Sequence, residues 1–558
     1  MKKILVIGGA AGGASAAVRL RRLSEKNTII LFEKEAQIAL AGCALPYYIS
    51  GVVTRREDLE AYTEANLKSR FNIDVRTQSE VVAIHPEEKN VVVSSDGREY
   101  SETYDCLIIA TGGRPVIPTI KGIEEANNVY TIDSLPDADR IKVAAEACRG
   151  GSVIVVGGSY VGLEMAESFR RLNLKVTVVE KGPQVLAGLD FEMAQIVHRE
   201  LNANSVSVIL NDGVSSIENN GKTVALESGR RLQADMLFFA TGITAENHLA
   251  RQAGFKLSER GFIITTGTFA VLDAETMTPV DGVYAVGNAV QVQGFVTRTG
   301  MDFALAGPAS RQGRLVADHL AGLPIDNAGV QGTSVLKIFT KTVGVTGAQQ
   351  EMLEKRHIAF QEVIVHANNH PAYYPGAEPL TLKLLYDVKT LKILAAQAVG
   401  GEGTDKRLDV LATAMRLGAT IRNLTSLELS CAPPYASVKD PVNILGYAAV
   451  NISDGIYKTV TWDKIDSLIQ MGGFLLDVRG THEYAKGHLE GAVNIPLDTL
   501  RDAADSLPED TTMPIYVYCS IGRHAYTAIR ILRGFGYKTL YALSGGYATY
   551  CDAHYTVH

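Results

Sequence analysis

The sequence predicts an α/β protein that contains two dinucleotide-binding folds. A strand, glycine-turn and helix pattern opens the chain and occurs again from Ser152. Two other apolar strands end in the same Ala-Thr-Gly triplet, at 110–112 and 240–242. At roughly 150 residues per domain, the length suggests three or four domains in all.

The first unit is "KILVIGGAAGGASAAVRLRRL" and the second is "SVIVVGGSYVGLEMAESFRRL". In each, a β-branched run ends in glycines before a helix-periodic stretch, so the backbone N–H groups of the turn and the helix N-terminus would face a pyrophosphate. A following strand ends in an acid, Glu33 or Glu180, which can accept hydrogen bonds from a ribose 2′-hydroxyl. Ala10 and Ser159 replace the middle glycine of the usual motif, but two matching copies favour nucleotide binding over simple tight turns.

Composition excludes several classes of function. The chain carries 54 basic and 61 acidic residues without a basic block, so nucleic acid is not an expected partner. Glycines follow the N-terminal lysines after four apolar residues, and no apolar run reaches 18, so we expect a soluble cytoplasmic protein. The six scattered cysteines indicate individual thiols rather than a disulfide framework, and no metal site is expected.

Over roughly residues 1–445 the glycine turns, the Ala-Thr-Gly strand ends and "GVYAVGNA" resemble the flavoprotein disulfide reductases with two dinucleotide folds. This resemblance implies two Rossmann-like domains and an α+β dimerisation domain. The boundaries that we expect are 1–115 with 245–325 for FAD, 116–244 for NAD(P)H, 326–446 for dimerisation, 447–458 for a linker and 459–558 for a last α/β domain.

The resemblance also implies the cofactor contacts. Those to FAD would come from Gly8, Ala11, Gly12, Glu33, Lys34, Cys43, Val81, Ala110, Thr111, Gly112, Asn288, Ala306 and Pro308. Those to the nicotinamide nucleotide would come from Gly157, Ser159, Tyr160, Val161, Glu164, Glu180, Lys181 and Gly242. The family usually has an aspartate at position 288, and an amide can still hydrogen-bond there. Glu180 would repel a 2′-phosphate and Lys181 would offset this only in part, so NADH is favoured and NADPH stays open.

The last hundred residues contain "FLLDVRGTHEYAKGHLEGAVNIP" and the loop "CSIGRHA", which closely resemble a rhodanese domain. Cys519 follows an apolar strand and precedes a glycine turn and a helix, where backbone N–H donors can stabilise a thiolate or a persulfide. Arg523 and His524 add nearby charge, with His524 in the place of the usual arginine. A buried structural role for Cys519 is the alternative.

Cys43, in "AGCALPYY", is the candidate redox thiol of the first domain. Tyr48 stands where most such reductases have a second cysteine, so the sequence resembles the single-cysteine subgroup of coenzyme A disulfide reductases and NADH oxidases or peroxidases. The alternative for an isolated cysteine is a small buried hydrophobe. The fused rhodanese domain favours coenzyme A disulfide and persulfide reductases. Ala39 and Gly42 replace the subgroup's serine and asparagine, which predicts a less stabilised thiolate and a less specific substrate site.

By the same resemblance, coenzyme A would contact Arg19 and Arg22 on the first helix and Lys439 of "YASVKDP". The alternative for the arginines is a solvated helix face. The dimerisation domain would bring a tyrosine, Tyr373 or Tyr374, into the partner subunit's site. Cys431 occupies the place of a second tyrosine, where it would either face the partner's Cys43 or fill space as a small buried side chain.

The expected function is reduction of coenzyme A persulfide, coenzyme A disulfide or polysulfide at Cys43, by FAD and NAD(P)H, in a homodimer whose sites are shared between subunits. Cys519 would handle sulfane sulfur. Three alternatives stay open: an NADH oxidase or peroxidase that cycles Cys43 through a sulfenic acid, a polysulfide reductase not specific for coenzyme A, and a rhodanese unit that only docks a partner.

Overall fold

The computed structural model describes residues 1–557 and divides the chain into two compact units. The first comprises Met1–Lys181 and Asp212–Val330, and the second comprises Gly182–Asn211 and the chain from Gln331 onward. Residues 182–211, which lie within the segment expected for the nicotinamide domain, fall in the second of these units. They include α6 (Phe191–Ala203) and β12 (Val206–Ile209).

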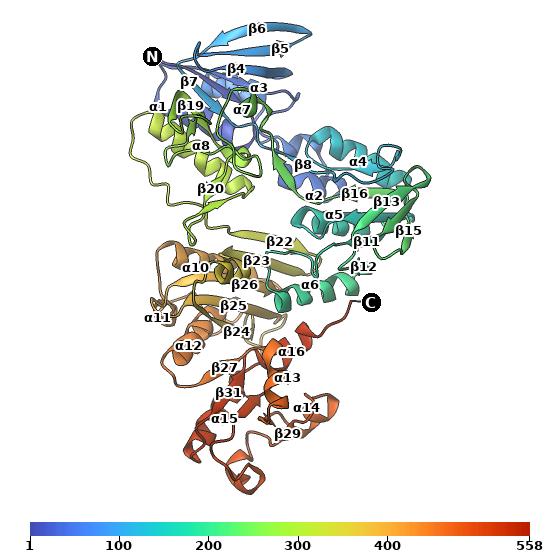
Figure 1. Cartoon of the computed structure of the whole chain (residues 1–558), viewed down its shortest axis with the longest axis vertical. Helices are drawn as coiled ribbons and strands as arrows, with labels where there is room; N and C mark the ends of the chain where they lie inside the picture. Colours follow the sequence, from blue (N-terminus) through green and yellow to red (C-terminus); the bar gives the residue numbers. More distant parts are fainter. Residues whose placement is uncertain (558) are drawn as a thin grey trace. The chain divides into compact units, whose positions relative to one another are not determined.

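The expected FAD domain is a six-stranded sheet in the order β18-β19-β7-β1-β2-β3 (Figure 1). Its strands are β1 (Lys3–Ile7), β2 (Thr28–Phe32), β3 (Asp74–Arg76), β7 (Cys106–Ile109), β18 (Ala270–Leu272) and β19 (Pro279–Ala285). β1 pairs in parallel with β2 and β7. Because successive β1 side chains point to opposite faces, Ile4 and Val6 enter one apolar core while Leu5 and Ile7 enter another.

Helices and a small sheet complete this domain. α1 (Ala11–Leu23) packs on α8 (Ala306–Leu320), and β4-β5-β6 form an antiparallel sheet. The strands of this small sheet are β4 (Ser79–His85), β5 (Asn90–Ser95) and β6 (Arg98–Thr103). The domain also contains the 3₁₀ turns η1 (Gly42–Ala44) and η4 (Gly287–Ala289) and the helices α2 (Leu45–Ile49), α3 (Glu64–Phe71) and α7 (His248–Gln252).

The second dinucleotide-type fold of this unit has its strands in the order β11-β10-β16-β9. These are β9 (Val129–Tyr130), β10 (Ser152–Val156), β11 (Lys175–Val179) and β16 (Met236–Phe239), accompanied by α4 (Leu135–Ala147) and α5 (Tyr160–Arg171) and by the antiparallel β13 (Val214–Glu218), β14 (Thr223–Leu226) and β15 (Arg231–Gln233). Two short strands, β8 (Gly113–Pro115) and β17 (Ile243–Ala245), pair antiparallel where the chain passes between the two folds. The predicted pair of dinucleotide folds is thus present.

The second unit contains a five-stranded antiparallel sheet in the order β22-β23-β26-β25-β24. Its strands are β22 (Ser334–Ile338), β23 (Lys341–Gly347), β24 (Phe360–Asn368), β25 (Pro379–Asp387) and β26 (Ile393–Gly400), and its helices are α9 (Gln350–Lys355), α10 (Thr404–Arg416), α11 (Ile421–Thr425) and α12 (Pro441–Ser453). We call these five strands the dimerisation sheet, after the domain that the sequence predicts here. α12 extends to Ser453, so the first half of the segment expected as a linker is helical.

The last part of the second unit is a parallel sheet in the order β27-β31-β30-β28-β29. It comprises β27 (Lys458–Val460), β28 (Phe474–Asp477), β29 (Val493–Asn494), β30 (Ile515–Tyr518) and β31 (Leu540–Leu543), with α13 (Trp462–Gln470), α14 (Thr481–Lys486), α15 (Arg523–Gly534) and α16 (Gly546–Ala553). Alternate residues of β30 enter two separate cores, Ile515 and Val517 in one and Tyr516 and Tyr518 in the other.

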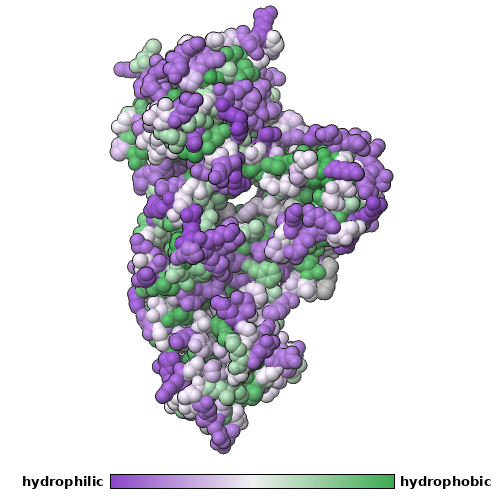
Figure 2. All heavy atoms as spheres, viewed as in Figure 1, coloured by the Kyte–Doolittle hydropathy of each residue, from purple (hydrophilic) through white to green (hydrophobic). Residues whose placement is uncertain are grey.

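On the face shown in Figure 2, hydrophilic residues predominate and hydrophobic ones are interspersed among them. Among the described residues 1–557, no helix is long and apolar enough to cross a membrane.

Candidate active sites

Two glycine turns of the same geometry follow β1 and β10. Gly8 has φ +99° and Gly157 has φ +105°, a backbone region that favours glycine. A Cβ atom on Gly8 would overlap the carbonyl oxygen of Ala110, and one on Gly157 would crowd that of Ala240. Each glycine turn therefore packs closely against the backbone of the alanine in one Ala-Thr-Gly triplet, Gly8 against Ala110 and Gly157 against Ala240.

Gly13 and Gly162, five residues after these glycines, were missing from the predicted site. A Cβ on either would overlap the carbonyl oxygen of the first glycine of its turn. The spacing of the GxGxxG motif was the signal that could have identified them.

The predicted acids lie against the turns. The Gly9 N–H donates to Oε2 of Glu33 at 2.8 Å, and the Gly158 N–H donates to Oε2 of Glu180 at 2.6 Å. Both carboxylates thus stand beside the turn that would cradle a pyrophosphate, as ribose recognition requires. Lys181 forms an ion pair with Glu227 at 2.9 Å, so its charge is already partly compensated.

Ser159 replaces a glycine because its side chain caps α5. Its Oγ accepts the Gly162 N–H at 3.3 Å and donates to the carbonyl oxygen of Ala240 at 2.8 Å. Tyr160 and Val161 form the first turn of α5, and Val161 is exposed.

The threonines of the Ala-Thr-Gly triplets have structural partners. The Thr111 hydroxyl donates to the Glu246 carbonyl at 2.7 Å, and the Thr241 hydroxyl donates to the Val116 carbonyl at 2.6 Å. Each threonine thereby joins the two chain segments that connect the first dinucleotide fold to the second. Gly112 and Gly242, with φ +76° and +124°, let the chain turn into β8 and β17.

The other predicted FAD residues lie near the first glycine turn. A Cβ on Gly12 would contact Val286 and Gly287, so α1 lies close to η4, which carries Asn288. α8, with Ala306 and Pro308 at its start, packs on both α1 and η4. Two helix N-termini, a glycine turn and Glu33 together fit a dinucleotide with a pyrophosphate. Val81 is buried in the core, so only its backbone could face such a ligand, whereas Lys34 is exposed.

Cys43 lies in η1, directly before α2. Cys43 is exposed, so the alternative of a small buried hydrophobe does not apply. The Ser168 hydroxyl of α5 donates to the Pro46 carbonyl at 2.8 Å and fixes α2 against α5. A Cβ on Gly42 would meet nothing within 4 Å, so space beside Cys43 stays open. Desolvation, followed by the negative charge of Glu164, raises the pKa of the Cys43 thiol.

Glu164, on α5, is the ionisable group that acts on Cys43. Burial, together with the charge of Glu167, raises its pKa to about 7, and a hydrogen bond with Tyr47 partly opposes this shift. An acid of this pKa can take up or release a proton near neutral pH. Tyr47 and Glu164 therefore place proton-transfer chemistry beside the thiol.

Cys519 follows β30 at the start of the predicted loop. Its side chain is 1% exposed, whereas Arg523 and His524 at the start of α15 are exposed. Gly522, with φ +88°, forms the turn between them. The N–H groups of Tyr547 and Ala548 in α16 donate to the carbonyls of Cys519 and Ser520 at 2.8 and 2.9 Å.

Glu483, in α14, contacts this loop and was not identified from the sequence. Its Oε1 accepts the Ser520 hydroxyl at 2.7 Å, and its Oε2 accepts the Gly480 N–H at 3.2 Å. These hydrogen bonds hold the pKa of Glu483 below its usual value, with burial opposing them. The carboxylate thus connects α14 to the Cys519 loop.

Three family profiles match successive segments of the chain. The profile of the pyridine nucleotide-disulphide oxidoreductases matches residues 2–313, that of their dimerisation domain matches 334–441, and that of the rhodanese-like domain matches 461–553. This chain belongs to the pyridine nucleotide-disulphide oxidoreductase family. The predicted fold class and enzyme class are confirmed.

Three individual relatives are similar to this family member. The coenzyme A disulfide reductase of Staphylococcus aureus (strain NCTC 8325 / PS 47) is 33% identical over 452 residues, which is 80% of this chain and all of that protein. The crystal structure of reduced Bacillus anthracis CoADR-RHD has 43% identity and a TM-score of 0.96 over 99% of this chain and 98% of its own. An NAD-dependent persulfide reductase from A. fulgidus has 32% identity and a TM-score of 0.90 over 98% and 100%.

In this oxidoreductase the residues predicted to bind coenzyme A differ in their partners. Nε of Arg19 donates to Oδ1 of Asp318 at 2.6 Å, whereas Arg22 is exposed with its guanidinium 5.4 Å from the centre of the Phe71 ring. Lys439 is exposed in the second unit. Arg22 is therefore the more available of the two arginines.

Cys431 and the paired tyrosines lie on the surface of the single chain. Cys431 is exposed, and its Sγ donates to the Ala436 carbonyl at 3.5 Å. Tyr373 is 79% exposed, and Tyr374, 40% exposed, makes an edge contact with the His370 ring. All three are thus exposed in the single chain.

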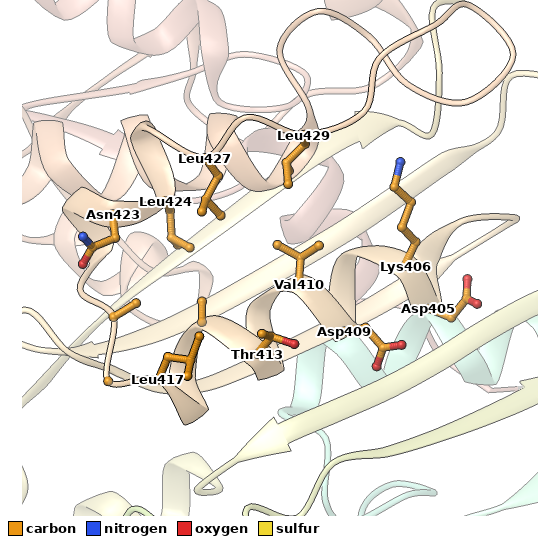
Figure 3. Close-up of a pocket in the computed structure, with 13 residues that line it drawn as sticks. Asp405, Lys406, Asp409, Val410, Thr413, Leu417, Asn423, Leu424, Leu427 and Leu429 are labelled. Atoms are coloured by element: carbon orange, nitrogen blue, oxygen red, sulfur yellow. The ribbon is translucent and has the colours of Figure 1, made fainter.

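A separate cavity of about 860 Å³ lies between α10 and the α11 region (Figure 3). Val410 from α10 and Leu424, Leu427 and Leu429 from the opposite wall point toward one another, with Asp405 and Lys406 at one end. No predicted site residue lines this cavity. Within residues 1–557, no cluster of His, Cys, Asp or Glu could hold a metal ion.

Proposed function

We propose that this oxidoreductase uses NADH and FAD to reduce coenzyme A persulfide, coenzyme A disulfide or polysulfide at Cys43, and that Cys519 carries sulfane sulfur. The observation that carries the proposal is one exposed thiol, Cys43, beside an acid of pKa about 7, in the same chain as a rhodanese-type cysteine loop. Relatives named coenzyme A disulfide reductase and persulfide reductase support this choice of substrates.

The chemistry at Cys43 begins with attack of its thiolate on the sulfur–sulfur bond of R–S–SH or R–S–S–R′. The attack forms a Cys43–S–S–R disulfide and releases hydrosulfide or a thiolate, and it works best when the attacking thiol has a pKa near ambient pH. FAD, when bound, takes two electrons from the nicotinamide nucleotide and supplies them to sulfur. For a persulfide, the balance is R–S–SH, NADH and H⁺ to R–SH, H₂S and NAD⁺.

Glu164, hydrogen-bonded to Tyr47, would supply the proton that this reaction consumes. A released thiolate or hydrosulfide needs a proton, and the Glu164 carboxyl, with its pKa of about 7, can supply one beside Cys43. Gly42, with open space beside it, and Ala39 have no side chain that could hydrogen-bond to a substrate near the thiol. This favours polysulfide as an additional substrate.

At the second site, Cys519 would take the terminal sulfur of a persulfide donor as Cys519–S–SH and release the donor as a thiol. An acceptor thiolate would then remove that sulfur as its own persulfide, so each transfer exchanges one sulfur–sulfur bond for another. The position of Cys519 between a strand end and a helix start suits this chemistry.

Nicotinamide preference would follow from Glu180. Its carboxylate already lies at the turn that would hold the pyrophosphate and would repel a 2′-phosphate. We infer NADH as the preferred donor. The six free cysteines are consistent with a reducing, cytoplasmic location.

We also infer a homodimer with shared sites, from the matched dimerisation domain and the exposed Tyr373, Tyr374 and Cys431. In this dimer, Cys431 of one subunit would attack the Cys43–S–S–R disulfide of the other, releasing R–SH and forming an intersubunit disulfide. A non-reducing gel after one equivalent of disulfide substrate, without NADH, should show a linked dimer. Absence of that band, or its persistence in Cys431→Ser, would contradict the pairing.

The test of the main proposal is anaerobic NADH oxidation with coenzyme A persulfide, coenzyme A disulfide, inorganic polysulfide and peroxide side by side. Sulfide release with the persulfide or polysulfide, little turnover with peroxide, and loss of all turnover in Cys43→Ser are expected. Peroxide as the best substrate by a wide margin would instead identify an NADH peroxidase.

A further inference from the structure

His366 of β24 connects the dimerisation sheet to α16. Its Nδ1 lies 2.9 Å from Oγ1 of Thr381, its cross-strand partner in β25, and its Nε2 lies 2.8 Å from Oγ1 of Thr549 in α16. Burial lowers the pKa of His366 to about 4, so the ring is neutral at physiological pH. A neutral imidazole has one donor and one acceptor nitrogen, and both are used here.

The start of α16 holds the backbone of the Cys519 loop. The first N–H groups of a helix have no partner within the helix. In α16, two of these groups, those of Tyr547 and Ala548, donate to the carbonyls of Cys519 and Ser520. Gly546 packs so closely that a Cβ there would overlap the Cys519 carbonyl oxygen. Any shift of this helix start would therefore move the cysteine loop.

Thr549 is the next residue of the same helix. The turn at Gly545, just before this helix, lies against β24. A Cβ on Gly545 would overlap Oγ1 of Thr549 and would lie 3.0 Å from Cγ2 of Ile364. Ile364 and His366 of β24 thus border this turn, Ile364 close to the Gly545 backbone and His366 through its hydrogen bond to Thr549.

We propose that His366 is a positioning residue for sulfur transfer at Cys519. It holds Thr549, Thr549 holds the first turn of α16, and that turn holds the carbonyls of Cys519 and Ser520. The loop of the rhodanese-like part is therefore completed by a residue of the dimerisation sheet. The inference rests on the proposed role of Cys519, but it does not depend on which thiol accepts the sulfur.

Two substitutions of His366 separate its two hydrogen bonds. The amide nitrogen of Gln can replace Nε2 and keep the contact to Thr549, whereas the shorter Asn can replace only Nδ1 and keep the contact to Thr381. We therefore expect His366→Gln to retain sulfur transfer. We expect His366→Asn and Thr549→Val to lower kcat for transfer from thiosulfate to cyanide about tenfold with KM changed less than threefold, because a misplaced loop affects the reacting sulfur more than donor binding.

The matched control is Tyr555→Phe. Asn202 of α6 donates to the Tyr555 hydroxyl at 2.8 Å, so this variant loosens the same part of the second unit without a bond to the loop. Its kcat for sulfur transfer should equal that of the wild type. Melting temperatures of all variants show how far each one is destabilised.

Equal kcat in His366→Asn, Thr549→Val and the wild type would overturn the proposal, as would an equal loss in His366→Gln and His366→Asn. A wild-type protein without any sulfur transfer would refute the proposed function of Cys519 instead. In that case the rate at which iodoacetamide labels Cys519 still tests the positioning, since it should differ between His366→Gln and His366→Asn.

Discussion

At the scale of single residues, the reactive features are two cysteines in contrasting surroundings. Cys43 is exposed beside Glu164, and Cys519 is buried at the base of a loop whose charged residues are exposed. The residue types and their places were predictable because each cysteine stands in a local motif. The raised pKa of Glu164 was not, because it results from burial and from Glu167.

Replacement of Glu164 by Gln should make Cys43 more reactive above neutral pH. The negative charge of Glu164 raises the pKa of the Cys43 thiol, so its removal favours the thiolate. Labelling of Cys43 by iodoacetamide, followed by mass spectrometry, should be roughly two- to fivefold faster at pH 8.

At pH 6 the wild type and Glu164→Gln should label at the same rate, because a carboxyl of pKa about 7 is then mostly protonated. Glu99→Gln, a change on the exposed β6, is the control and should behave as the wild type at both pH values. An unchanged rate at pH 8 would show that Glu164 does not act on this thiol.

At the scale of elements, the two glycine turns show how far a local pattern determines structure. Each was predicted from a strand, a glycine cluster, a helix and a following acid. Each acid indeed meets an N–H of its turn. The bond from Thr111 to Glu246 could not be predicted, because it joins residues 135 positions apart.

Substitution of Gly157 by Ala should weaken nicotinamide binding without loss of FAD. The new Cβ would be strained at φ +105° and would crowd the Ala240 carbonyl, a cost on the order of 2 kcal/mol or more. KM for NADH should rise about tenfold or more, since 1.4 kcal/mol corresponds to a factor of ten.

The flavin absorbance of the purified variant gives its FAD content, which should equal that of the wild type. Gly267→Ala is the matched control, because a Cβ there would meet nothing within 4 Å and its φ is not positive. A Gly157→Ala variant with normal KM would mean that this turn does not hold the nicotinamide nucleotide.

At the scale of the whole molecule, one buried lysine joins distant segments of the second unit. Lys383 in β25 forms ion pairs with Asp190, Glu192 and Glu362 at 2.8, 2.5 and 2.9 Å. Although burial opposes it, the three carboxylates hold the pKa of Lys383 above its usual value. Glu192 also accepts the Trp462 indole N–H at 3.2 Å. The cluster thus links α6, the dimerisation sheet and α13.

Substitution of Lys383 by Met should strongly destabilise the second unit. Removal of one partner leaves buried carboxylates uncompensated, which costs about 3–5 kcal/mol. Differential scanning calorimetry should show a lower melting temperature at pH 7. Lys355→Met is the control, because it removes only an exposed ion pair to Glu351 and should cost less than about 1 kcal/mol. Equal melting temperatures for the two variants would contradict this account.

Acid should also destabilise this unit through its buried histidines. His198 and His366 both have a pKa near 4 because of burial, below the ordinary value of 6.5. Between these two pKa values the unfolded chain binds more protons than the folded one. The contribution of each neutral histidine to the free energy of unfolding is therefore fully present above pH 6.5 and is lost as the pH falls toward 4. The loss is about 3 kcal/mol for each histidine.

The fall in melting temperature between pH 6.5 and 4.5 should therefore be shallower in His366→Gln, which cannot be protonated. His482→Gln, which changes an exposed histidine of the same unit, should leave the fall unchanged. A wild-type slope in His366→Gln would mean that this residue is charged in the folded protein.

Local patterns were enough to predict the two dinucleotide folds and to single out Cys43 and Cys519, and the resemblance to known families added the dimerisation and rhodanese-like parts. Those features depend on residues close together in the chain, whose spacing sets the strand, turn and helix. Tertiary structure alone buries Lys383 among three acids and brings His366 to the helix that holds the Cys519 loop. These arrangements arise from burial and from hydrogen bonds between segments far apart in sequence, which no local spacing encodes.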